Sequence, residues 1–297
     1  MYPKKISVLL TTFNGSKYIK QQLDSIFAQD ILPDEIIICD DNSPDETGSL
    51  LRNYKGNGVT PIKLFVNEKQ LGVVQNFKKA AKLAKKGNWL AFSDQDDIWM
   101  PQKLKKLGEK MKQIDNDILP ALVYSDLALI NRNNAVTAGS FWEKQNIKPS
   151  TLNFPRLLYG NTATGCTMLI NYPMAEELFS MDSNQFLHDE WLTLIAYSFG
   201  KVNFLTDKLV LYRQHENNLT FSEDYQYRGV LGNMIEDFRY LTGRKNFLLH
   251  QFELAKAFLA KYNYRLNGEQ IKILENFINQ ENKNYLLQRI RRRITYF

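Results

Sequence analysis

The hydrophobic residues in the first half of the chain fall into short runs separated by longer amphipathic stretches. Apolar runs begin at Ile6, Ile36, Ile62, Trp89 and Leu122, and each is short, as is typical of a buried strand. Between these runs the apolar residues recur at three- and four-residue spacing, which predicts amphipathic helices. This alternation predicts an α/β domain whose sheet is open, mostly parallel and covered by helices on both faces.

The second half of the chain has a different pattern. A Gly-rich stretch at 160–167, a helical run that begins at His188 and a strand pair that ends at His215 predict a mixed region over residues 127–220. Helical spacing dominates after residue 225. We therefore divide the chain into a domain of residues 1–220, with a first half at 1–126 and a second at 127–220, and a C-terminal helical region at 221–297.

Polar clusters follow three of the predicted strands. They lie at 11–14, 40–43 and 94–97. Ligands of open α/β sheets bind at the carboxyl ends of the strands, so we expect the three clusters to meet at one edge of the sheet. The chain has neither a Gly-x-Gly-x-x-Gly turn after the first strand nor a phosphate-binding P-loop, so the sequence predicts a ligand that is held differently.

Three carboxylates, Asp94, Asp96 and Asp97, crowd directly behind an apolar strand. Such crowding is unfavourable unless a cation neutralises the charge. Oxygen ligands suit Mg²⁺ or Mn²⁺, which commonly bridge to substrate phosphates, so the loop is a candidate clamp for a metal and a diphosphate. The alternative is an acidic cap for the helix that follows Pro101, because aspartate is also favourable in a first helical turn.

The net charge is concentrated at the end of the chain. The 297 residues carry a formal charge of +6, of which residues 282–297 contribute +5, so residues 1–281 sum to +1. A nearly neutral body is not typical of a nucleic-acid-binding domain, and we expect no nucleic-acid partner. Apolar residues line one face of the basic segment. This pattern predicts either peripheral contact with an anionic membrane surface through 282–297 or a helix that packs on its own domain.

The remaining composition indicates an ordinary globular protein of the cytosol. The chain is 44% hydrophobic and 24% charged, and it has no apolar run of the ~18 residues that a transmembrane helix needs. The apolar run behind Lys4 and Lys5 is too short for a signal peptide. Cys39 and Cys166 lie in no metal-binding spacing, so we expect two buried, reduced thiols.

The order and spacing of these motifs over residues 4–220 resemble the family-two glycosyltransferases of GT-A fold. The resemblance lies in the segments VLLTTFN at 8–14, ICDDNS at 38–43 with Thr47, Asn67, LG at 71–72 with Asn76, and FSDQDDIW at 92–99 with Pro101. The SDQDDIW form, together with His188-Asp189 and the segment YRQH at 212–215, is most similar to the bacterial rhamnosyltransferase branch. The resemblance makes residues 1–126 the nucleotide-binding half and residues 127–220 the acceptor-binding half.

The resemblance also implies a binding site for the nucleotide-sugar donor. In similar enzymes Thr11 and Phe13 would line the pocket for the pyrimidine and the ribose, and Asp41 would accept a hydrogen bond from the base. Asp94 would lie near the ribose. Arg213 lies on a segment that similar enzymes fold over the diphosphate.

A metal site of Asp96, Asp94 and His215 follows from the same resemblance. Asp96 is expected as the direct ligand of Mg²⁺ or Mn²⁺, with Asp94 beside it, and His215 would join the metal shell.

The resemblance assigns catalysis to Asp189, which would act as the general base. Inverting transfer needs a carboxylate that removes the proton of the acceptor hydroxyl. Glu190 is the alternative base, and an acidic first helical turn is the structural alternative for both residues. Gly165, Cys166 and Trp191 are expected on the acceptor side.

Together these features predict a metal-dependent, inverting glycosyltransferase that adds a single sugar. The expected donor is dTDP-L-rhamnose, and the acceptor is a glycan or lipid-linked glycan of cell-surface polysaccharide at the inner face of the membrane. The Gln-x-x-Arg-Trp signature of processive synthases is absent. Two alternatives remain open: a UDP-hexose donor on the same fold, and a non-catalytic module that binds carbohydrate or nucleotide.

Overall fold

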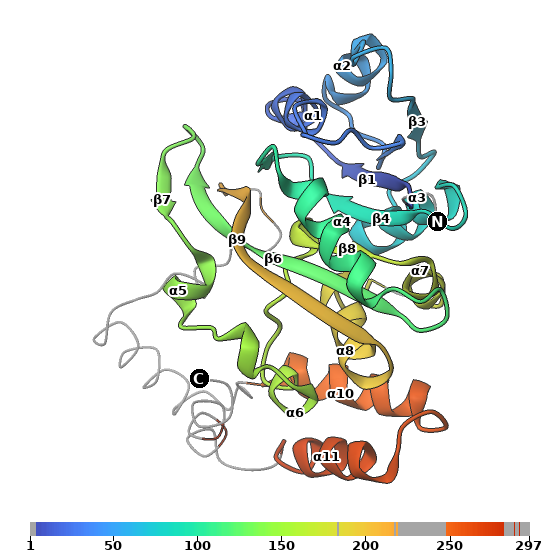
Figure 1. Ribbon diagram of the computed structural model, residues 1–297, viewed down its shortest axis with the longest axis vertical. Coiled ribbons are helices and arrows are strands. Elements are labelled where there is room, and N and C mark those ends of the chain that lie inside the picture. The colour runs from blue at the N-terminus through green and yellow to red at the C-terminus, as the bar shows by residue number, and fades with distance from the viewer. Residues whose placement is uncertain are drawn as a thin grey trace. The chain divides into compact units, whose positions relative to one another are not determined.

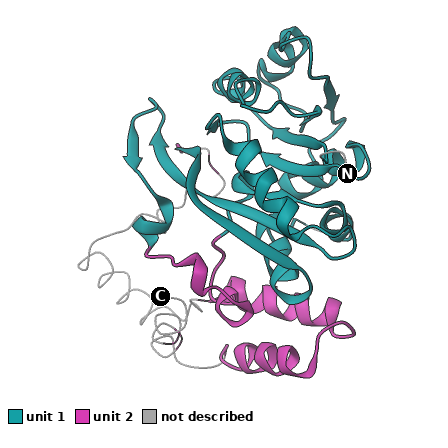
Figure 2. Cartoon of the chain, in the orientation of Figure 1, with its two compact units in different colours: residues 1–145, 163–213 teal, residues 146–162, 214–297 magenta. Residues whose placement is uncertain are grey.

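The computed structural model describes residues 4–182, 184–216, 218, 248–281, 288 and 291. The chain forms two compact units (Figure 2). The first unit comprises residues 1–145 and 163–213, and the second comprises 146–162 and 214–297. Most of the basic segment at 282–297 and the region at 225–247 lie outside the described residues.

The described strands of the first unit form one mixed sheet (Figure 1). They are β1 (Ile6–Thr12), β2 (Glu35–Asp40), β3 (Ile62–Val66), β4 (Trp89–Ser93), β5 (Ile98–Trp99), β6 (Ala121–Asn131), β7 (Val136–Ala138), β8 (Leu169–Ile170) and β9 (Lys201–Gln214). Their order is β3-β2-β1-β4-β8-β6-β9-β5, and β7 pairs with β6. The strands expected in the first half of the chain are all present.

Helices connect these strands and form the described part of the second unit. The first unit contains α1 (Ile19–Phe27), α2 (Thr47–Asn53), α3 (Val73–Leu83), α4 (Lys103–Ile114), α5 (Phe141–Gln145), the 3₁₀ helix η2 (Gly165–Thr167), α7 (Tyr172–Phe179) and α8 (His188–Phe199). The second contains the 3₁₀ helix η1 (Pro149–Thr151), α6 (Phe154–Leu157), α10 (Leu249–Tyr262) and α11 (Gly268–Ile278).

The parallel part of the sheet is its N-terminal half. β1 pairs in parallel with both β2 and β4, and β2 with β3. β8 then pairs antiparallel with β4 and with β6, and β5 pairs antiparallel with β9. The expectation of a strand pair before His215 is wrong, because β9 is one long strand. Residues 201–214 contain no Gly or Pro, so the chain has no residue that favours a tight turn there.

The central strands β1, β2 and β4 are buried on both faces, and this explains their continuous apolar runs. On one face Val8 and Leu10 of β1 pack in a core with Leu23 of α1 and Leu104 of α4. On the other face α3 packs on β1 and β2, and the ring of Phe77 lies 5.2 Å from that of Phe92. The helices predicted on both faces are confirmed.

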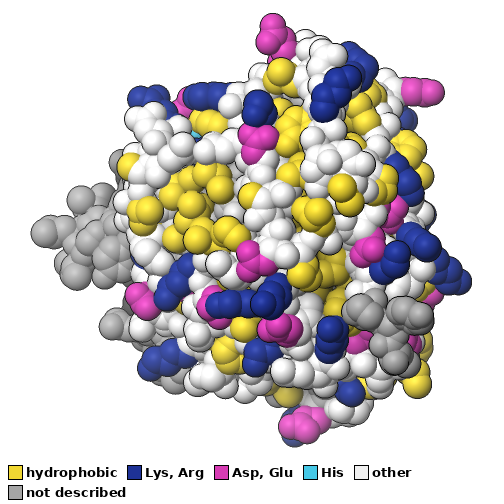
Figure 3. All heavy atoms as spheres, turned by 45° about the horizontal axis from the view of Figure 1, so that its top comes forward, with side chains coloured by type: hydrophobic (Ala, Val, Ile, Leu, Met, Phe, Trp, Pro, Cys, Tyr) yellow, Lys and Arg dark blue, Asp and Glu magenta, His cyan; other side chains and the backbone are white. Residues whose placement is uncertain are grey.

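The helices of the second unit pack through aromatic side chains. Phe252 of α10 and Phe277 of α11 have ring centroids 4.8 Å apart. Asn267 caps α11 by accepting a hydrogen bond from the backbone N–H of Gln270 at 2.9 Å. No helix in the described part of the chain is long and apolar enough to span a membrane. On the face drawn in Figure 3, Lys and Arg side chains are interspersed with Asp and Glu side chains.

Candidate active site

The loops that follow β1 and β2 are joined by hydrogen bonds. The backbone N–H of Asp41 donates to the carbonyl of Thr12 at 2.8 Å, and that of Asn14 donates to the hydroxyl of Ser43 at 2.9 Å. Asn14 and Asn42 have φ of 54° and 63°, a left-handed conformation that asparagine tolerates. These turns bring the ends of two parallel strands together, as the sequence predicts.

The loop after β4 is bonded to the loop after β1 through the side chain of Gln95. Its side-chain oxygen accepts from the hydroxyl of Thr12 at 2.6 Å and from the N–H of Phe13 at 2.8 Å. Its amide nitrogen donates to the carbonyl of Phe13 at 3.0 Å. Thr11 is buried beneath this junction, whereas Phe13 is 37% exposed. A planar ring is therefore accessible at the shared edge of the three strands, in a position where a nucleobase could stack.

Asp41 is buried, and the protein itself satisfies most of its carboxylate. Oδ1 accepts from the side-chain amide of Asn67 and from the N–H of Leu71, each at 2.7 Å. Oδ2 accepts from the N–H of Gly72 at 2.9 Å. A carboxylate has about four acceptor positions, so these three bonds leave one position on Oδ2.

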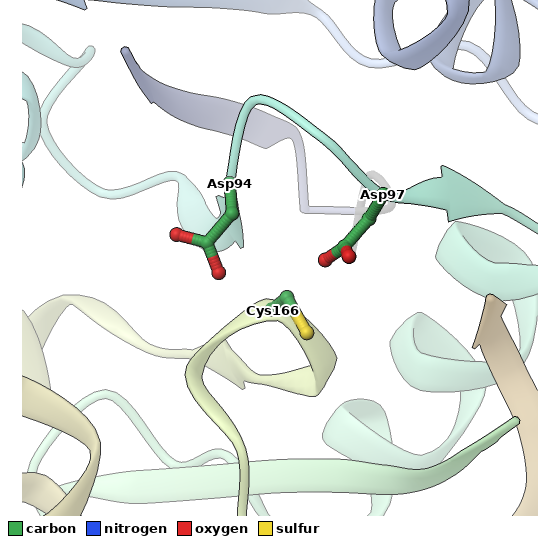
Figure 4. Close-up of side chains that lie close together, drawn as sticks. All are labelled: Asp94, Asp97 and Cys166. Carbon is green, nitrogen blue, oxygen red and sulfur yellow. The ribbon is translucent and has the colours of Figure 1, made fainter. Parts of the chain in front are cut away.

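The three aspartates after β4 lie on the loop between β4 and β5 rather than at a helix end. Helix α4 begins at Lys103, its N-cap residue is Gln102, and no side chain caps it. The helix-cap alternative is therefore wrong for Asp94, Asp96 and Asp97. Figure 4 shows the carboxylates of Asp94 and Asp97 pointing from this loop toward η2, where Cys166 lies. The ligand atoms of these three residues all lie within 4.8 Å of one another.

The charges of this acidic loop are only partly offset by the buried cation of Lys103. Burial, reinforced by the Asp96 carboxylate, raises the pKa of Asp94 to about 7. Burial and the carboxylates of Asp96 and Asp94 raise the pKa of Asp97 well above its ordinary value. Oδ1 of Asp97 accepts from the backbone N–H of Arg213 at 3.1 Å, and a hydrogen bond from the Cys166 thiol also lowers the pKa of Asp97. No nitrogen or oxygen donor of the described residues bonds to the buried Oδ2.

An unpaired, buried carboxylate oxygen beside two further carboxylates fits a divalent cation, because a cation supplies the missing compensation. Asp94 and Asp97 are the residues whose oxygens would hold it, with Asp96 in the same acidic cluster. Carboxylate oxygens suit Mg²⁺ and Mn²⁺. Burial keeps the pKa of the Cys166 thiol well above its usual range, so a thiolate ligand is disfavoured.

Asp189 lies in the first turn of α8. Its Oδ1 accepts from the N–H of Glu190 at 2.8 Å, and its Oδ2 accepts from the N–H of Gly165 at 3.2 Å. Burial raises the pKa of Asp189 to about 7, with further contributions from Glu190 and Asp94. A carboxylate with such a pKa is suited to proton transfer near neutral pH. Glu190 instead accepts from the N–H of Leu187 at 3.4 Å.

Residues 7–179 match the family described as Glycosyl transferase family 2. The chain belongs to this family. It is therefore a glycosyltransferase that depends on a nucleotide sugar, and its fold is the GT-A fold.

Curated relatives of the glycosyltransferase differ in their donors. The chain is 27% identical over 239 residues to WfgD of Escherichia coli, named UDP-Glc:alpha-D-GlcNAc-diphosphoundecaprenol beta-1,3-glucosyltransferase, and the match covers 78% of this chain and 87% of the relative. It is 26% identical over 244 residues to the dTDP-rhamnosyl transferase RfbG of Shigella flexneri, covering 75% and 79%.

Solved structures share its fold. Residues 1–349 of TarS from S. aureus, in complex with UDP, superpose with a TM-score of 0.61 at 19% identity, covering 93% of this chain and 71% of that chain. The mannosyltransferase PcManGT from Pyrobaculum calidifontis, in complex with GDP-Man and Mn²⁺, gives a TM-score of 0.52 at 15% identity, covering 99% and 85%.

Arg213 of the glycosyltransferase is buried and bound to protein groups. Its Nε donates to the carbonyl of Asp96 at 2.7 Å, and one terminal nitrogen donates to the side chain of Gln21 at 2.8 Å. The other donates to the side chain of Asn134, and the guanidinium lies 4.5 Å from the ring centroid of Tyr18. These contacts fix the acidic loop against α1. A diphosphate contact by Arg213 stays a prediction.

Lys103 is a buried residue near the site that the motifs do not reveal. Its Nζ donates to the carbonyl of Cys166 at 2.6 Å and lies 3.2 Å from the ring centroid of Trp99. Burial lowers the pKa of Lys103 to about 7. The sequence does contain a signal for it, because Lys103, Leu107 and Met111 repeat every four residues and so share the buried face of α4.

The residues expected on the acceptor side are buried in the glycosyltransferase. Gly165 and Cys166 lie in η2, and the Trp191 ring stacks on Phe186 with centroids 6.0 Å apart. Their acceptor roles stay predictions. His215 belongs to the second unit, where its backbone N–H donates to the side chain of Asn218 at 2.6 Å. Its role as a metal ligand also stays a prediction.

Replacing Asp97 with Asn tests the acidic loop. We expect the metal-free variant to be more stable than the wild type by about 1–3 kcal/mol at pH 8, because a neutral amide removes a buried charge that is only partly compensated. The folded pKa of Asp97 is raised above the unfolded value of about 3.9, so its effect on wild-type stability becomes less favourable as pH rises above that value. The stability that Asp97→Asn gains over the wild type should therefore increase with pH.

The measurement is urea unfolding of Asp97→Asn between pH 4 and 8, with and without Mn²⁺. The exposed carboxylate of Asp182 provides the control, and Asp182→Asn should change stability little. Stabilisation by Mn²⁺ should be lost in Asp97→Asn only. Equal stabilisation of both variants by Mn²⁺ would place the cation away from the acidic loop.

Proposed function

We propose that the glycosyltransferase transfers a single L-rhamnosyl residue from dTDP-rhamnose, with inversion, to a glycan or lipid-linked glycan of cell-surface polysaccharide. The observation that carries the catalytic part is the environment of Asp189. Its carboxylate is fixed by two backbone N–H groups, its pKa is raised to about 7, and the Asp94 carboxylate is among the charges that raise it. A base and an acidic loop that fits a cation therefore lie in one electrostatic environment.

In this reaction Asp189 accepts the proton of the acceptor hydroxyl as the hydroxyl oxygen attacks the anomeric carbon. The bond from that carbon to the diphosphate oxygen breaks on the opposite side. A divalent cation, when bound, would neutralise charge on the departing diphosphate. Asp94 and Asp97 would hold that cation, and Gly165 and Glu190 keep the base oriented through their N–H groups.

The free acceptor position of Asp41 supports a pyrimidine nucleotide. Thymine and uracil each present one ring N–H between two carbonyls, and one free position on Oδ2 matches that single donor. Guanine presents two adjacent donors, for which Asp41 has no second free position. The exposed ring of Phe13 supplies a surface on which either pyrimidine can stack.

Rhamnose is supported by the SDQDDIW segment and by the dTDP-rhamnosyl transferase of Shigella flexneri among the relatives. A second candidate donor is UDP-glucose, because the glucosyltransferase of Escherichia coli is similar to this chain to the same degree. The names of both relatives concern bacterial glycosyl transfer, and the diphosphoundecaprenol in one of them supports a lipid-linked acceptor.

A panel of nucleotides tests the donor. We expect dTDP and UDP, each with Mn²⁺, to raise the melting temperature, because a ligand at 100 times its Kd stabilises the folded state by about 2.7 kcal/mol. GDP at the same concentration serves as the control and should give little shift. A larger shift with GDP would overturn the pyrimidine assignment. Turnover of dTDP-rhamnose against UDP-glucose, with a lipid-linked acceptor, then decides the sugar.

A further inference from the structure

His188, the first residue of α8, is a buried polar residue that the proposed reaction does not use. Its ring packs against two aromatic side chains, with centroids 4.5 Å from Phe77 and 4.9 Å from Phe92. Both ring nitrogens are buried with no hydrogen-bond partner. Burial lowers the pKa of His188 to about 3, so the ring is neutral at physiological pH. Its contribution to the site therefore rests on shape rather than charge.

The ring of His188 also lies against Gly165. A β-carbon placed on Gly165 would lie 2.8 Å from Nε2 and 3.1 Å from Cε1 of His188. Such distances are too short for ordinary contact, so only glycine lets η2 approach the ring this closely. Gly165 is also the residue whose backbone N–H donates to Oδ2 of Asp189 at 3.2 Å.

We propose that the contact between Gly165 and His188 positions the carboxylate of Asp189. The phenylalanine rings hold His188, His188 sets how closely Gly165 can approach, and the N–H of Gly165 orients Asp189. This inference rests on the proposed role of Asp189 as the base, and it makes both Gly165 and His188 positioning residues. It gives Gly165 a function different from direct contact with the acceptor sugar.

Two substitutions and their combination test the contact. Gly165→Ala should lower kcat by about 10- to 100-fold, because the added methyl group pushes η2 away from the ring and a displaced catalytic group loses rate steeply. His188→Ala should lower kcat less, by a few-fold, because it removes the ring and leaves Gly165 unobstructed. In the double variant the methyl group added at position 165 no longer meets the imidazole ring, so kcat should recover to about that of His188→Ala, above that of Gly165→Ala.

Gly139→Ala is the matched control, because a β-carbon there would have nothing within 4 Å. It should leave kcat unchanged. Thermal unfolding and dTDP binding, measured for every variant, test whether each is folded. If Gly165 contacts the acceptor instead, Gly165→Ala should raise the KM for the acceptor, and His188→Ala should not rescue it. A double variant no more active than Gly165→Ala overturns the proposal.

The pH dependence of kcat supplies a second readout. Displacement of the N–H of residue 165 weakens a hydrogen bond that lowers the pKa of Asp189, so the acid limb of the profile should move to higher pH in Gly165→Ala and return in the double variant. The other groups that act on this carboxylate are Glu190, through its charge and its N–H, and Asp94. An unchanged acid limb in Gly165→Ala contradicts the proposal.

Asp189→Asn, assayed in parallel, distinguishes a failure of the proposed base from a failure of the contact between Gly165 and His188. An active Asp189→Asn variant means that the proposed base is wrong. An inactive one, combined with a failed rescue, means that only the positioning contact is wrong.

Discussion

Asp189→Asn should reduce transfer by about 10²- to 10⁴-fold, the range that a general base contributes. An amide keeps the size of the carboxylate but cannot accept the proton of the acceptor hydroxyl. Donor binding should persist, because Asp189 acts on the acceptor. The measurement is kcat for sugar transfer, with dTDP binding followed by thermal shift in the same samples.

Glu190→Gln is the matched control for Asp189→Asn. Glu190 is the neighbouring acid, and its side chain accepts from the backbone N–H of Leu187. We expect a loss of less than 10-fold, since an amide oxygen can keep that bond. A larger loss of rate in Glu190→Gln than in Asp189→Asn would assign the base to Glu190. The wild-type rate should rise with pH through about 7, because the active form of Asp189 is the deprotonated one.

Arg213→Ala should destabilise the protein by about 3–5 kcal/mol, as expected when one partner of a buried polar network is removed. The guanidinium is fully buried, and its loss would leave the carbonyl of Asp96 and the side chain of Gln21 without their donor. We also expect transfer to fall by about 100-fold, since a displaced catalytic loop loses rate steeply. Urea unfolding and kcat measure the two effects.

Arg132→Ala is the control, because Arg132 is exposed and its loss should change stability by less than about 0.5 kcal/mol. Arg213→Lys should recover only part of the stability, since an ammonium cannot reproduce the planar fork of donors. If Arg213 binds the donor diphosphate instead, Arg213→Ala should raise the KM for the donor and leave unfolding nearly unchanged. That result would contradict the structural role.

Much of the first unit could be predicted from local pattern alone. The runs at Ile6, Ile36, Ile62 and Trp89 became β1 to β4, and α8 begins at His188 as expected. These predictions succeed because a strand buried on both faces needs an uninterrupted apolar run, and a helix on a sheet needs an apolar stripe. The strand pair expected before His215 failed, because β9 pairs with strands that are distant in sequence.

The candidate site could be located from the sequence, but its internal connections could not. The polar clusters after β1, β2 and β4 mark the edge of the sheet, and Asp94 already stands out as a carboxylate in that pattern. Asp189 was found only through the resemblance to the family. The sequence around the acidic loop fits both an acidic helix cap and a cation site. The start of α4 decides against the cap, because the helix begins at Lys103 with Gln102 as its N-cap residue and no side-chain cap.

The sequence by itself determined the family, the parallel half of the sheet and the residue types that gather at its edge. Tertiary structure alone decided what each of those residues does with its hydrogen bonds. Asp41 keeps one free acceptor position, Arg213 joins the acidic loop to Gln21 of α1 through its guanidinium, and Gly165 leaves space for His188. The physical reason is that hydrogen bonds and close contacts at this site join residues far apart in the chain, whereas sequence patterns report only on neighbours within a strand or a helix.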